Sequence, residues 1–75
     1  MTTADVVREQ ALLLARTEPD GEEAIRELEA VSEGRRVAAV LARQQVSAWL
    51  DSEPDQADAI RAIELLDRLL DRLPA

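Results

Sequence analysis

The chain has 75 residues and carries 16 acidic against 9 basic side chains, a formal net charge of −7. It contains neither cysteine nor histidine, which excludes disulfides, thiolate metal sites and the usual general base of enzymes. The acidic balance argues against direct binding of nucleic acid, and no apolar run is long enough to span a membrane. Because the first residues also lack a secretion signal, we expect a cytoplasmic protein with no cofactor, no metal and no membrane partner.

Four helices are expected in chain order, over residues 4–16, 22–31, 35–51 and 55–73. A threonine at position 2 or 3 can cap the first helix, with Asp5 in its first turn. The segment TEPDG (residues 17–21) predicts a stop and a restart, because Pro19 disfavours helix before it and Asp20 can cap the next helix. Gly34 suits the left-handed conformation that ends many helices.

Larger apolar side chains recur at helical spacing and predict the buried face of each helix. In the first helix this stripe is Val6, Val7, Gln10, Leu13 and Leu14, and in the third it is Ala38, Leu41, Ala42, Gln45, Ala48 and Trp49. In the second helix it is Ala24, Ile25, Leu28 and Val31, and in the fourth Ala59, Ile60, Ile63 and Leu66.

The segment TEPDGEEAIRELEAV (residues 17–31) returns 35 residues later as SEPDQADAIRAIELL, with seven identical positions. The same offset pairs Gln10 with Gln45, so the match covers a whole unit of two helices. We therefore expect one all-α domain over residues 1–75. Its four helices form two duplicated hairpins, repeat 1 over about 4–34 and repeat 2 over about 35–74, in a small bundle.

Two helical hairpins at this period resemble tetratricopeptide repeats, which run at about 34 residues each. The segments GEEAIRELEAV (residues 21–31) and QADAIRAIELL (residues 56–66) are similar to the second helix of that motif. Leu73 and Pro74 fall near its closing proline. The resemblance implies a tetratricopeptide-like pair of hairpins that binds a peptide or protein.

The fourth helix has more apolar residues than one buried face requires, over roughly 220° of its circumference. This surplus predicts a docking surface for a partner protein or, most simply, a homodimer. The expected contact residues are Ile60, Leu65, Leu69 and Leu73, with Leu12 of the first helix. On this hypothesis the protein is a non-enzymatic interaction module. Replacing Leu65 and Leu69 by arginine should then leave a helical but monomeric or less stable protein.

Acidic residues at the starts of the second and fourth helices suggest a second hypothesis. If the two hairpins lie side by side, these residues form one acidic rim, made of Asp20, Glu22, Glu23, Asp55 and Asp58. Such a rim could hold a divalent cation or serve as a decoy for a basic, nucleic-acid-binding protein. The alternative is that acids simply favour the first turns of helices.

Three residues are candidates for the core and for its register. Gln10 and Gln45 lie within apolar stripes, so they could bond each other between the hairpins, or each could reach the edge of the core. Trp49, the single aromatic residue, is expected to fill the core or else to anchor an interface.

An enzymatic function is disfavoured because no nucleophile lies near an evident base. A carrier protein modified on Ser52 is a third alternative, but Glu-Pro follows that serine where carrier proteins have a hydrophobic residue.

Overall fold

The structure is a computed structural model that describes residues 1–17 and 20–74. All regular elements in those ranges are α-helices: α1 (Thr3–Thr17), α2 (Gly21–Ser32), α3 (Arg36–Ser52) and α4 (Ala57–Arg72). The expected all-α fold is confirmed, and each helix begins and ends within about two residues of its predicted bounds. The role predicted for Pro19 falls outside the described residues.

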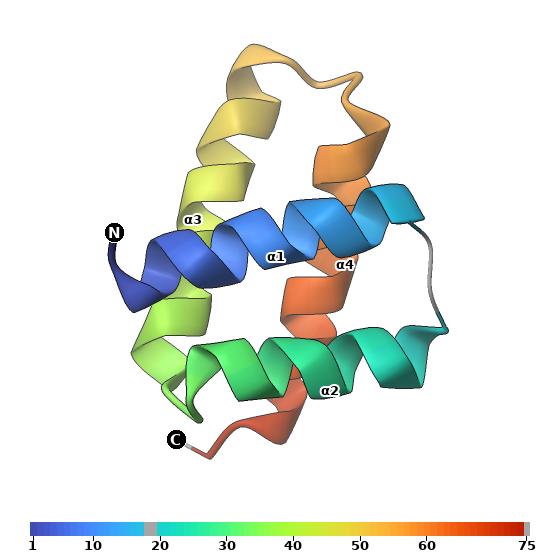
Figure 1. The fold of residues 1–75 in the computed structure, drawn as a ribbon. Coiled ribbons are helices and arrows are strands. Elements are labelled where there is room, and N and C mark those ends of the chain that lie inside the picture. Colours follow the sequence, from blue (N-terminus) through green and yellow to red (C-terminus); the bar gives the residue numbers. More distant parts are fainter. Residues whose placement is uncertain (18–19, 75) are drawn as a thin grey trace.

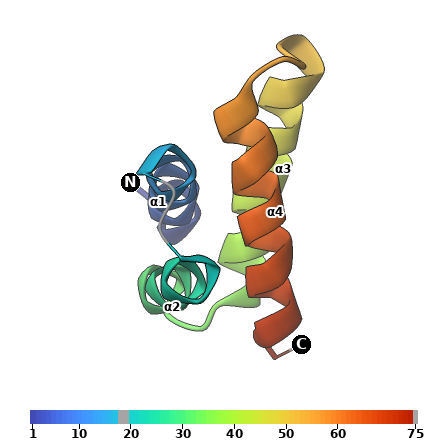
Figure 2. The same cartoon turned by 90° about the vertical axis from the view of Figure 1, so that its right-hand side faces the viewer.

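The four helices form two layers that cross each other (Figure 1). α1 and α2 run antiparallel in one layer, and α3 and α4 run antiparallel in the other. Figure 2 shows α1 and α2 nearly end-on beside the upright α3 and α4. α1 packs against both helices of the other layer, whereas α2 packs mainly against α1 and α4 and touches α3 little.

Alanine side chains make up much of the fully buried core. Ala11, Ala39, Ala42, Ala59 and Ala62 have no exposed surface. Small side chains at a crossing let two helix axes approach closely. Larger residues pack around this centre: Val7, Ile25, Leu28, Val46, Leu65, Leu66 and Leu69.

The predicted stripes of α1 and α3 are only partly buried: Val7, Leu14, Ala38 and Ala42 lie in the core as predicted, but other members do not. Val6, Leu13 and Leu41 are exposed, as are Gln45 and Ala48. The residues that are buried but were not predicted are Ala4, Ala11 and Ala15 on α1, and Ala39 and Val46 on α3. Each buried face is therefore turned by a fraction of a helical turn from the predicted stripe, and most of the residues that it adds are alanines.

Some positions related by the 35-residue offset are alike in the structure, although others, such as the buried Ile25 and the exposed Ile60, differ. α1 ends at Thr17 and α3 ends at Ser52, positions that the offset relates. Four further pairs related by the offset are buried in both members: Ala4 with Ala39, Val7 with Ala42, Ala11 with Val46 and Ala24 with Ala59. Superposition of the two halves stays a prediction, and so does the tetratricopeptide-like pairing.

The helix ends agree in part with the predicted caps. The Asp5 amide donates to Thr2 Oγ1 at 3.2 Å and the Thr2 amide donates to Asp5 Oδ2 at 3.1 Å, so each residue caps the other. Asp20 makes no side-chain cap hydrogen bond. Gly34 is left-handed as predicted, with φ of 70°, and Glu33 before it is also left-handed, with φ of 56°.

Glu33 combines a left-handed backbone with a negative charge at the C-terminal end of α2, and both features oppose stability. Replacing Glu33 by Asn, which tolerates this conformation and is neutral, should raise the free energy of unfolding by about 0.5 kcal/mol. Urea denaturation followed by circular dichroism measures the change. Glu33→Gln removes only the charge, so a gain as large as that of Glu33→Asn would show that the backbone conformation costs nothing.

Candidate protein-interaction surface

The apolar end of α4 faces the interior of its own chain, so the docking surface predicted there is wrong. Leu65 and Leu69 are 1% and 0% exposed, and Leu73 is also buried. Leu12 is partly buried against the same core. Of the five predicted contact residues, Ile60 alone is exposed.

The crossing of the layers explains why α4 needs so wide an apolar arc. α3 packs along one side of α4, and α1 and α2 cross over it at two successive levels. A helix in a simple bundle buries about one face, but α4 has neighbours in both its own layer and the crossing layer. The additional apolar residues of α4, which predicted a partner, are therefore buried by contacts within the same chain.

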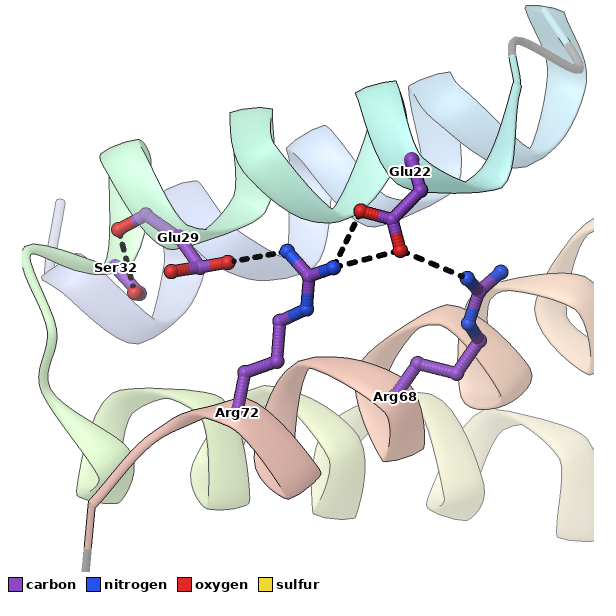
Figure 3. A network of polar contacts seen from close by, with 5 residues as sticks. All are labelled: Glu22, Glu29, Ser32, Arg68 and Arg72. Atoms are coloured by element: carbon purple, nitrogen blue, oxygen red, sulfur yellow. Dashed lines mark hydrogen bonds and ion pairs between the residues drawn. The ribbon is translucent and has the colours of Figure 1, made fainter.

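Polar contacts join the second half of α4 to α2 (Figure 3). Arg72 Nη1 donates to Glu29 Oε1 at 2.9 Å, and Arg72 Nη2 donates to both carboxylate oxygens of Glu22. Arg68 Nη2 lies 3.9 Å from Glu22 Oε1. These ion pairs link α2 to the last turns of α4.

The same contacts shift the titration of the two partners. Hydrogen bonds from Arg72 lower the pKa of Glu22 below its usual range. The carboxylates of Glu29 and Glu22 raise the pKa of Arg72. The network therefore favours the charged forms of both side chains.

The predicted acidic rim is divided by this arrangement. Glu22 pairs with Arg72 near the end of α4, whereas Asp58, in the first turn of α4, lies 3.9 Å from Arg16 of α1. Those two positions on α4 are separated by roughly 20 Å along the helix. Asp20, Glu23 and Asp55 are exposed. Among the described residues, no group of three or more acids is arranged to hold a metal ion.

Of the two alternatives for Gln10 and Gln45, the structure shows the second: each reaches the edge of the core, and no hydrogen bond joins them. Gln45 Oε1 accepts a hydrogen bond from Arg8 Nη1 at 2.7 Å, because α1 turns Arg8 toward α3 at this level. Gln45 is exposed and Gln10 is half-buried, so both lie at the edge of the core. Trp49 packs partly against the core, and its Nε1 donates to Glu53 Oε2 at 2.9 Å.

The outer face of α3 carries the exposed apolar residues that sequence reasoning missed. Val37 is 65% exposed and Leu41 is 43% exposed. Gln44 and Ala48 continue the same face, and both are exposed. We call these four residues the α3 stripe.

The α3 stripe is notable for its lack of charge. A third of the whole chain is charged, yet residues 37–50 contain one charged side chain, Arg43. Arg43 turns toward α4, where its Nε donates to Asp67 Oδ1 at 2.6 Å, and this bond raises the pKa of the guanidinium. The stretch without free charge was the available signal for this surface in the sequence.

A hollow adjoins the α3 stripe where the start of α1 lies beside α3. Its volume is about 380 Å³, and Val37 and Leu41 form part of its wall. Thr2, Thr3, Ala4 and Asp5 line the α1 side, and Arg35, Ala38 and Gln45 complete the wall. The stripe and the hollow together form one continuous candidate surface.

Comparison within the chain distinguishes this surface from its counterpart on α1. The 35-residue offset relates Leu41 to Val6, Ala48 to Leu13 and Gln44 to Glu9. Both faces are exposed, but the α1 face keeps the charge of Glu9, which also pairs with Arg8 at 3.1 Å. The face on α3 has an uncharged amide at that position.

The chain matches no protein-family model, no curated protein sequence and no solved structure. None of the described helices combines the length and the hydropathy that crossing a bilayer requires.

Truncating a leucine in the enclosed end of α4 should be far more costly than truncating an exposed residue. Leu69→Ala should lower the free energy of unfolding by about 2–5 kcal/mol, because it leaves a cavity in the core. The same truncation at the exposed Val37 should change it by less than about 0.5 kcal/mol. Arginine at Leu65 and Leu69 should unfold the chain, since it would place two charges in the core. Urea denaturation checks all three. If the double-arginine variant is helical and as stable as the parent, Leu65 and Leu69 are not in the core and the docking surface on α4 is possible again.

The ion pairs between α2 and α4 (Figure 3) should make the stability of the fold depend on pH. Because the pKa of Glu22 is lowered in the folded state, its ion pair stabilises the fold above the ordinary glutamate pKa. That contribution is lost as the pH falls through the lowered value. Glu22→Gln should therefore reduce the urea midpoint at neutral pH and have little effect in strong acid. Glu27→Gln, on the same helix, is the control. Equal effects of the two variants at neutral pH would contradict the prediction.

Proposed function

We propose that this chain is a non-enzymatic protein-interaction module that docks on its partner through the α3 stripe and the adjoining hollow. The observation that carries the proposal is an uncharged face with exposed Val37 and Leu41 on a chain with a net charge of −7. Contiguous apolar surface without charge is typical of docking sites. Covering it removes apolar area from water at about 25 cal/mol per Å².

The chemistry of the hollow supports binding without catalysis. Asp5 is the carboxylate in its wall, and hydrogen bonds from Thr2 lower the pKa of that carboxyl. A carboxylate whose charged form is stabilised in this way is a poor general base. Arg35, also in the wall, suits recognition of an acidic group on a partner.

An acidic decoy for a basic protein is the second hypothesis, and the division of the predicted rim weakens it. Glu22 and Glu29 are engaged by Arg72, and Asp58 lies beside Arg16. A decoy would bind through the remaining exposed acids, and its binding should weaken steeply with salt. Docking on the α3 stripe should depend much less on salt.

The test uses two leucines of nearly equal exposure. Leu41 on α3 is 43% exposed and Leu13 on α1 is 47% exposed, so arginine at either site should leave the fold intact. The tagged parent should capture a bound polypeptide, which can be another copy of this chain. The Leu13→Arg variant should still capture it, and the Leu41→Arg variant should not. Affinity capture from the native organism with mass spectrometry of the bound chains measures this. Identical capture by the parent and Leu41→Arg would contradict the proposal.

A further inference from the structure

We infer that the partner of the α3 stripe is a second copy of this chain, with the two α3 helices packed antiparallel about a two-fold axis. The inference rests on the proposed function and names its partner. It is carried by three independent features of α3: the spacing of the exposed residues, the charges at the two ends of the helix, and the charge of the helix as a whole.

The stripe has the spacing of a helix–helix seam. Val37, Leu41, Gln44 and Ala48 are separated by four, three and four residues, which is the repeat of a two-stranded coiled coil. In an antiparallel pair this spacing stacks Val37 against Ala48 of the second copy and Leu41 against Gln44 of the second copy. Large residues thus meet smaller or flexible ones in every layer.

Gln44 can fix how the two α3 helices align along their axes. Polar residues in such seams fix the alignment of the two helices because their hydrogen bonds are lost when the helices slide. The two Gln44 side chains approach each other near the two-fold axis, where their amides can bond. The corresponding residue on α1, Glu9, would place two negative charges together in the same position.

The end charges of α3 fix the orientation. Arg35 precedes the helix and Asp51 lies in its last turn, the reverse of what the helix dipole favours. The ion pairs found within residues 1–17 and 20–74 include neither of them. In the antiparallel register, Arg35 comes within one helical turn of Asp51 of the second copy. A parallel pair would oppose like charges at both ends.

The same helix is where two acidic chains repel least. Residues 35–50 contain three arginines and no acidic residue, whereas the whole chain has a net charge of −7. Two copies approaching through α3 therefore meet at the least acidic part of each chain. The exposed surface of one chain is 4411 Å², and a standard interface would cover roughly a fifth of it. One helix pair covers less, so the dimer should be reversible and should form with rising concentration.

The experiment is sedimentation velocity of the full chain between about 10 μM and about 1 mM. The parent should pass from monomer to dimer over this range. Arg35→Glu and Asp51→Arg should each weaken dimerisation by about tenfold, because each creates two like-charge contacts per dimer. The variant with both changes should return to within about threefold of the parent, since the exchanged charges again attract.

Matched controls separate this effect from net charge. Arg26→Glu and Glu23→Arg make the same charge changes at exposed sites on α2. Their dissociation constants should stay within about threefold of the parent. Circular dichroism verifies that each variant is folded.

Two results would overturn the inference. A parent that stays monomeric at every concentration excludes the second copy as partner, while the comparison of Leu41→Arg with Leu13→Arg still decides the docking proposal separately. The antiparallel pair is excluded if Arg35→Glu and Asp51→Arg each weaken dimerisation but the double variant does not restore it.

Discussion

The close crossing of helices over buried alanine side chains is the constraint on which this fold depends. Ala11 of α1, Ala39 and Ala42 of α3, and Ala59 and Ala62 of α4 are wholly buried. A larger residue at any of these positions would separate the layers and open gaps around the leucines and valines beside them. The crossing also determines which surfaces remain free, because the helices differ in how much of their surface the other helices cover.

Two consequences of the crossing bear on function. α4 lies against all three other helices, so its long apolar end is enclosed and the arginines of that end hold α2 through Glu22 and Glu29. α3 has its neighbours on adjacent sides and leaves its outer face, with Val37 and Leu41, open to solvent. The surface available for a partner is therefore on α3, where the sequence also places the fewest charges.

Much of the architecture followed from local sequence signals. The number of helices, their bounds, the cap formed by Thr2 and Asp5 and the left-handed Gly34 are set by neighbouring residues, and these could be read from the chain. The buried faces of α1 and α3 could be predicted only in part: Val7, Leu14, Ala38 and Ala42 are buried as expected, whereas Leu13 and Leu41 are exposed. Periodicity shows that a helix has an apolar face, but it does not show at which angle another helix packs on it.

The candidate site was misplaced for a related reason. A wide apolar arc on α4 signals many neighbours, and the sequence does not show whether those neighbours belong to the same chain. The pattern therefore predicts that Leu65 and Leu69 contact a partner, whereas in the structure they are buried within their own chain, where α4 packs against α1, α2 and α3.

Methyl nuclear Overhauser contacts report whether α4 is enclosed by its own chain. In dilute, monomeric protein, the leucines in the second half of α4 should show strong contacts with Ile25 or Leu28 of α2. If these contacts are absent in the monomer, or appear only when the protein associates, α4 is not enclosed by its own chain.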